Sequence, residues 1–104
     1  MWEVKETAPA SELHYGHATV GVTAVPLTVV SRKLVHGLLL RTPGPNDLYP
    51  NIDTVYIGKQ GVTTSASDGI PMPPGSVLEL PVEDPSQIYA ISLTAGQDIT
   101  WVGV

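Results

Sequence analysis

Histidines and a small group of acidic residues are the side chains that offer catalytic or metal-binding chemistry. His14 and His17 stand three positions apart, a spacing that on a helix would suit a pair of metal ligands. They border a strand-like pattern instead, and no carboxylate or thiol of fitting spacing accompanies them. His36 precedes Gly37 and is typical of a turn or surface position. We therefore predict no metal site and no cofactor.

Glu79, Glu83 and Asp84 are the best candidates for a pair of catalytic carboxylates, as used in glycoside hydrolysis. Adjacent residues in a turn point apart, so we expect these side chains to solvate a loop. The chain has no G-x-S-x-G motif for a serine nucleophile, and residues 58–61 lack the length of a phosphate-binding loop. These patterns predict that the protein is not an enzyme.

Aromatic side chains leave a carbohydrate-binding role open, because an aromatic face can stack on a sugar ring. Trp101 and Tyr89 stand in apolar strand patterns and are expected in the core. Tyr49 and Tyr56 border a loop rich in proline and are the freer candidates for stacking.

Composition indicates one domain built from short strands. The 104 residues include ten glycines and ten prolines, and 14% of them are charged. So little charge, with a mean hydropathy of +0.13, predicts exposed apolar surface and an oligomer. All five Lys and Arg residues precede residue 60 and the net charge is −5, so nucleic acid is excluded as a partner. No apolar run approaches the length that spans a membrane.

Alternation with a period of two predicts an all-β fold of seven or eight short strands, arranged as a β-sandwich or jelly roll. Turn residues separate the runs at intervals of about ten residues. The last run ends on apolar residues, so we expect it to be docked inside a sheet. The expected strands are His17–Ala24, Leu27–Val30, Val35–Thr42, Thr54–Gly58, Val62–Thr64, Val77–Val82, Gln87–Thr94 and Ile99–Val104.

Residues 1–16 show no convincing period and are expected to form an N-terminal arm, with the β-domain at 17–104. The arm is either a frayed terminus or a segment that orders on a partner. The loop from Pro43 to Asn51 is dense in residues that oppose regular structure and is a second candidate for contact. The predicted capsid or partner contacts are Trp2, Val4, Leu13, Tyr15, Leu48 and Tyr49.

Four segments between Val25 and Val104 carry a resemblance to a known group of proteins. They are LVHGLLLRTPG (34–44), PNIDTVYIGKQGVT (50–63), GIPMPPGSVLELPVEDPSQIYAI (69–91) and GQDITWVGV (96–104). This pattern resembles the small virion-associated β-domain proteins of tailed bacteriophages, of the head decoration or fibre-base type. The resemblance implies a non-enzymatic capsid or fibre component, often trimeric.

Two functions remain as expectations from the sequence. The first is a capsid decoration protein that self-associates, as a homotrimer, and binds the major capsid protein. It would be synthesised in the host cytoplasm and lie on the capsid surface of the virion. The second is a carbohydrate-binding or receptor-binding module of a phage fibre.

Overall fold

The computed structural model describes residues 13–65 and 67–104, which form eight strands and one short 3₁₀ helix. The prediction of an all-β domain with seven or eight strands is confirmed. The elements are β1 (His14–Val20), β2 (Val25–Pro26), β3 (Leu38–Arg41), β4 (Val55–Gly58), β5 (Ile70–Met72), β6 (Val77–Leu80), η1 (Pro85–Gln87), β7 (Tyr89–Ser92) and β8 (Gln97–Gly103).

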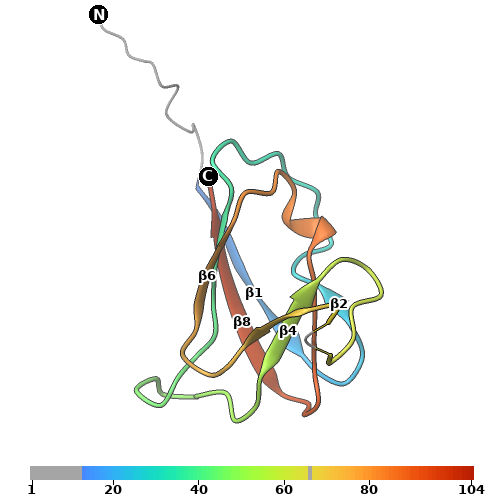
Figure 1. Cartoon of the computed structure of the whole chain (residues 1–104). Helices are drawn as coiled ribbons and strands as arrows, with labels where there is room; N and C mark the ends of the chain where they lie inside the picture. The colour runs from blue at the N-terminus through green and yellow to red at the C-terminus, as the bar shows by residue number, and fades with distance from the viewer. Residues whose placement is uncertain (1–12, 66) are drawn as a thin grey trace, which may run out of the picture.

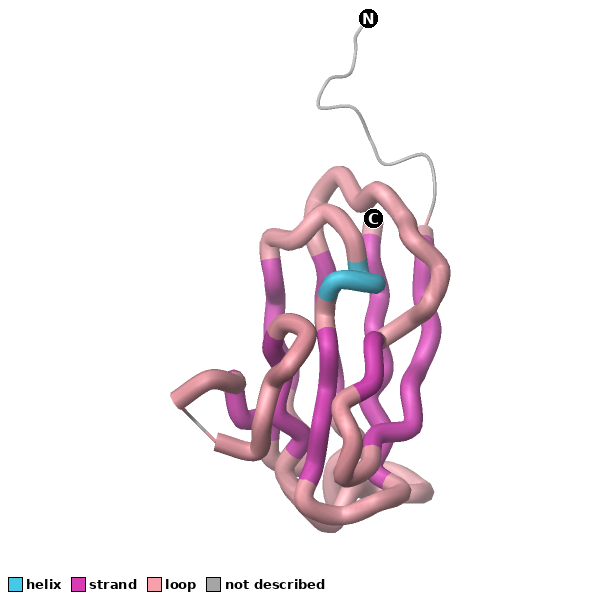
Figure 2. Tube along the Cα trace, turned by 90° about the vertical axis from the view of Figure 1, so that its right-hand side faces the viewer, coloured by secondary structure: helices cyan, strands magenta, loops and turns pink. Residues whose placement is uncertain are grey.

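The strands form two antiparallel sheets of four strands each. Sheet A has the order β1-β8-β3-β6, and sheet B has the order β2-β7-β4-β5. Figure 1 shows β8 alongside β1, with the C-terminus at the end of the molecule where β1 begins. The helix η1 lies at that same end (Figure 2). Every neighbouring pair of these strands is antiparallel, although of the six pairs β4–β5 alone is consecutive in the chain.

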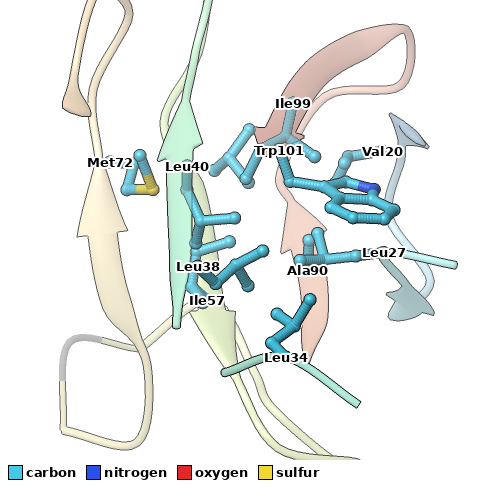
Figure 3. Packing of buried hydrophobic residues seen from close by; sticks show 11 residues of the cluster. Val20, Leu27, Leu34, Leu38, Leu40, Ile57, Met72, Ala90, Ile99 and Trp101 are labelled. Atoms are coloured by element: carbon cyan, nitrogen blue, oxygen red, sulfur yellow. The ribbon is translucent and has the colours of Figure 1, made fainter. Parts of the chain in front are cut away.

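The core lies between the two sheets, because alternate residues of each strand point toward the opposite sheet. On sheet A, Leu40 and Ile99 are fully buried, and on sheet B Val55 and Ala90 are fully buried. Figure 3 shows the indole of Trp101 packed beside other members of this cluster. The other buried members are Val20, Leu27, Leu34, Leu38, Ile57 and Met72.

The last strand is docked inside a sheet, as the apolar C-terminal run predicted. Strand β8 pairs with β1 on one side and with β3 on the other. Beyond β8, the carbonyl of Val104 accepts hydrogen bonds from the backbone N–H groups of Val35 and His36 at 2.8 and 2.7 Å. The chain end is therefore held by backbone pairing on both sides.

The first strand begins and ends earlier than the sequence predicted. β1 starts at His14, so residues 14–16 of the expected arm belong to the sheet, while residues 1–12 lie outside the described part of the chain. β1 ends at Val20 because the chain then leaves sheet A: the Gly21 carbonyl accepts a hydrogen bond from the N–H of Ser92, in β7 of sheet B. Alternation in the sequence continues through this crossover, which hid the change of sheet.

Two expected strands are absent from the described residues, and others are shorter. Residues 27–30 form a loop after the two-residue β2, and residues 62–64 belong to the loop between β4 and β5. Val62 is nevertheless buried, since it packs as a loop residue against Gly58 and Gly69. The predicted strand at 35–42 is paired only from Leu38 to Arg41. Of the apolar residues in these segments, Leu27 and Val62 are buried although they lie outside strands, whereas Val29, Val30 and Val35 are exposed.

Leu40→Ala is predicted to lower the free energy of unfolding by about 2–5 kcal/mol, because truncation leaves a cavity between the sheets. Leu39→Ala is the matched control, since Leu39 is the neighbouring leucine on the opposite face of β3 and is 40% exposed. Its cost should be about 1 kcal/mol or less. Urea unfolding measures both variants, and equal costs would contradict the assignment of the inner face.

Candidate functional site

The side of sheet A that faces away from the core, here called the outer face, gathers residues from all four strands. Strand register places Tyr15, Val102, Leu39 and Glu79 in one row across the sheet. The next row contains His17, Thr100, Arg41 and Val77. The outer face therefore consists of an apolar row beside a polar one.

The apolar side chains of the first row are exposed to solvent. Tyr15 is 74% exposed, and Val102 and Leu39 are 37% and 40% exposed. A hollow of about 530 Å³ adjoins this row, with Leu39, Val102 and Val104 among its lining residues. Adjacent apolar side chains around a hollow form a patch of the kind that marks contact sites for other macromolecules.

A rigid loop borders the polar row. The carboxylate of Asp47 forms a two-pronged ion pair with Arg41 Nη2, at 2.6 and 2.7 Å, and accepts the N–H of Gly44 at 2.7 Å. The hydrogen bonds from Arg41 and Gly44 hold the pKa of Asp47 below its ordinary value. These bonds fix the loop so that its tip, Leu48 and Tyr49, projects at 84% and 77% exposure.

The far end of the same loop is anchored to β8 through a buried amide. Asn51 donates from Nδ2 to the carbonyl of Asp98 at 2.8 Å and accepts the Asp98 N–H at 2.7 Å. The Gln97 side chain accepts the N–H groups of Ile52 and Asp53 at 2.8 and 3.0 Å. Side-chain amides here replace the backbone partners that a strand would supply, so the exposed tip stands on a well-ordered base.

A second hollow of about 380 Å³ lies where this loop meets the outer face. Its lining combines the Arg41–Asp47 ion pair, the Asp98 carboxylate, the His17 imidazole and the Tyr49 ring. Donors, acceptors and an aromatic face thus surround one open surface. Sequence reasoning missed Arg41, Asp47 and Asp98, although the opposite charges of Arg41 and Asp47 on either side of Pro-Gly-Pro-Asn were a usable signal for a clamped loop.

The predicted contact residues divide into three groups. Leu48 and Tyr49 form the loop tip. Tyr15 lies on the outer face. Leu13, which is 60% exposed, is the residue immediately before β1. Trp2 and Val4 lie outside the described residues. The contact role itself stays a prediction.

The two histidines at positions 14 and 17 belong to β1, where residues three apart point to opposite faces. His14 is half-buried and His17 is exposed on the outer face. They therefore cannot ligate one ion together. Within residues 13–65 and 67–104, no cluster of three metal-ligating side chains occurs, and no helix is long and apolar enough to cross a membrane.

Asp84 has a structural role in holding a loop. Its carboxylate caps η1 by accepting the Ser86 N–H at 2.9 Å, and it also accepts hydrogen bonds from the Ser31 hydroxyl and the Arg32 N–H. The bond from Ser31, followed by that from the Ser86 N–H, lowers the pKa of Asp84 to about 2. Asp84 thereby ties the segment before β3 to the turn before β7.

The aromatic residues are placed partly as predicted. Trp101 is 4% exposed and belongs to the core, as expected. The prediction that Tyr89 lies in the core is wrong, because the small residues Ala90 and Ser92 occupy the inward face of β7 and Tyr89 takes the other face. Tyr49 lines the second hollow, whereas Tyr56 lies in β4 of sheet B.

Comparisons with protein-family models, with curated proteins and with solved structures found no match to this chain. The functional argument therefore depends on the geometry of the outer face and its loop.

Asp84→Asn is predicted to lower the free energy of unfolding at neutral pH, and the loss should be smaller in acid. Because folding lowers the pKa of Asp84 from 3.8 to about 2, its contribution is complete above pH 4 and is lost as the pH falls toward 2. Urea unfolding at several pH values should show the wild type and the variant converging over that interval. Glu83→Gln, at the exposed neighbouring carboxylate, is the control; a difference between wild type and Asp84→Asn that stays constant with pH would contradict the capping role.

Proposed function

We propose that this chain is a non-enzymatic structural protein of a bacteriophage virion, a capsid decoration protein that binds and stabilises the head lattice. The observation that carries the proposal is the outer face of sheet A, where an apolar row is exposed and a projecting loop tip borders the neighbouring polar row. The sequence resemblance to virion-associated β-domains supports the choice of a virion as the site of action.

The outer face has the composition of a contact surface. Tyr15 offers an aromatic anchor, and Leu39 and Val102 add apolar area beside it. Burying such side chains at the centre of a contact is where most binding free energy arises. Glu79 and His17 border the row and would form the polar rim.

On a capsid, individually weak contacts are sufficient for binding because the same site is repeated many times. Many identical sites are presented by a head lattice, and a self-associating protein engages several of them at once. A protein that binds the assembled lattice and not its separated subunits stabilises the assembled state by mass action. The proposed partners are thus the major capsid protein and further copies of this chain, as a homotrimer, on the capsid surface of virions made in the host cytoplasm.

Exposed apolar residues beyond the outer face support self-association. Val29 is 87% exposed and Ile52 is 78% exposed, and both lie in loops. Association of copies would cover part of this surface. The low fraction of charged residues, 14%, agrees with a subunit that works inside an assembly.

The second candidate function is carbohydrate or receptor binding at a phage fibre. It is favoured by the second hollow, where the Tyr49 ring stands beside the Arg41–Asp47 ion pair and the Asp98 carboxylate. Such a set can stack on a sugar ring and hydrogen-bond its hydroxyl groups.

The decoration proposal predicts that Tyr15→Ser with Leu39→Ser lowers binding to purified phage heads on the order of tenfold or more, because the apolar anchor is removed. Co-sedimentation with heads measures the bound fraction. Leu93→Ser, which removes a 63% exposed apolar side chain from the turn between β7 and β8, outside the outer face, should bind as the wild type does. A wild-type chain that ignores heads and stays monomeric would overturn the proposal.

The fibre alternative predicts that Tyr49→Ala abolishes binding on a glycan array while Tyr56→Ala retains it, since only Tyr49 of the two lines the hollow. Circular dichroism checks that both variants are folded. Glycan binding lost on changing Tyr49, together with intact head binding in the same variant, would assign the two functions to different parts of the surface. An array with no signal for the wild type would remove the alternative.

A further inference from the structure

Within residues 13–65 and 67–104, no strand pairs with the free edge of β1. β1 is the outermost strand of sheet A, and its seven residues pair with β8 in continuous register without a bulge. Its sequence, HYGHATV, contains neither lysine nor proline, the residues that commonly block further pairing at an edge. The backbone of β1 can therefore accept another strand.

A hollow of about 270 Å³ lies along this edge. It is lined by residues 13–17 on one side, by Leu27, Thr28 and Arg32 on the other, and by Trp101. Inward-facing positions of β1 open onto it, because His14 and Gly16 alternate with the more exposed Tyr15 and His17. The hollow thus lies between the open edge of β1 and the interior of the sandwich.

An unsatisfied donor lies against this hollow. Trp101 is only 4% exposed, and its Nε1 has no hydrogen-bond acceptor among the described residues. Gly16 lies over it: a Cβ at that position would approach Nε1 to 3.1 Å. Figure 3 shows the indole nitrogen at the outer rim of the labelled cluster. Buried N–H groups are nearly always paired, so this one indicates an acceptor that the described residues do not supply.

We infer that the edge of β1 binds residues 2–6 of a second copy of this chain as an added antiparallel strand. This inference rests on the self-association in the proposed function and specifies how two copies join. The added strand would hydrogen-bond to the backbone of β1, a common mode of recognition at exposed sheet edges.

The sequence of residues 2–6, WEVKE, matches the edge and its hollow. Trp2, Val4 and Glu6 share one face of an extended strand, and Glu3 and Lys5 share the other. In this register Val4 stands opposite Gly16, where it would pack against the Trp101 indole that covers the glycine, and Glu6 stands opposite His14.

The acceptor for Trp101 then comes from the added strand. Trp101 belongs to β8, but its indole extends over Gly16 of β1, so Nε1 lies above the strand next to the added one. A long side chain at a diagonal position of the added strand reaches that far, and the carboxylate of Glu6 would accept the Trp101 Nε1–H. Charge agrees with this pairing: residues 1–7 carry two acids and one base, while His14, His17 and Arg32 line the hollow.

The connection favours exchange between copies over folding back onto the same chain. Residues 7–12, TAPASE, contain no Gly, Asn or Asp, the residues on which tight hairpin loops depend. Pro9 favours an extended backbone at the residue before it. Residues 7–13 connect the added strand to β1, and seven extended residues span about 23–25 Å, which is enough to reach the edge of an adjoining copy.

Disulfide trapping between two variants tests the exchange, and the natural chain is free of cysteine. The register places Glu3 opposite His17, both on the outer side of the sheet. Full-length Glu3→Cys mixed with full-length His17→Cys should give covalent heterodimer under mild oxidation, on the order of tenfold more than Glu3→Cys mixed with the exposed control Gln60→Cys. Equal yields would overturn the inference. So would a double variant, Glu3→Cys with His17→Cys, that closes its disulfide within one monomer.

The indole N–H of Trp101 provides a second readout that needs no cross-link. Its ¹H–¹⁵N resonance should move downfield as the protein concentration rises, because the Glu6 carboxylate arrives as its acceptor. Glu6→Ala should abolish this shift, whereas Glu3→Ala, which changes the outward face, should retain it. A resonance that is independent of concentration and of Glu6 would overturn the inference and would leave the hollow filled by solvent alone.

Molecular mass in solution separates this inference from the proposed function. A chain that associates and binds heads but forms no Glu3–His17 cross-link disproves the strand exchange and leaves the decoration role standing. A chain that is monomeric at every concentration disproves both. A cross-linked dimer that does not bind heads supports the exchange and disproves the role on the capsid.

Discussion

Backbone pairing of β8 on both of its sides is the interaction on which the rest of the structure depends. β8 holds β1 and β3 at fixed register, and through β3 it also fixes β6. Its alternation places Ile99 and Trp101 in the core and Thr100 and Val102 on the outer face. One strand thereby sets the packing between the sheets and the arrangement of the surface to which we assign binding. Because β8 lies between β1 and β3, sheet A cannot be complete until the segment after β7 is in place.

Polar side chains here form hydrogen bonds with backbone groups that longer strands would pair in a larger domain. Strands here are two to seven residues long, so many backbone groups lie in loops and need other partners. Asp47, Asp84 and Gln97 accept hydrogen bonds from loop backbone, and Asn51, itself in a loop, bonds to the backbone of Asp98 in β8. Their bonds hold the segments around the outer face without any disulfide. Of the three carboxylates considered as catalytic candidates in the sequence, Asp84 is thereby explained as a loop anchor, while Glu79 lies in β6.

The proposed function and the inferred strand exchange use different parts of sheet A. Capsid contact is assigned to the outer face, with Tyr15 and Leu39 at its centre, whereas the exchange uses the edge of β1 and the hollow near Trp101. A strand added at the edge would extend the sheet and leave the outer face accessible. Self-association and lattice binding are therefore compatible in one domain of this size.

The sequence alone predicted the fold class, a count of seven or eight strands and the docking of the last one, because a period of two with frequent turn residues is a local signal. It did not locate every strand: β2 and β5 were not expected, and residues 27–30 and 62–64 are loops. It also marked Leu48 and Tyr49 as exposed, since Pro and Gly oppose regular structure around them. Tertiary structure decided which strands are neighbours, and hence that Tyr15, Val102 and Leu39 form one row and that Arg41 lies beside Asp47. It also decided that Tyr89 faces outward and that the alternation after Val20 continues into another sheet. Alternation divides the residues of a strand between two faces but does not show which face is buried. Packing against the other sheet determines that.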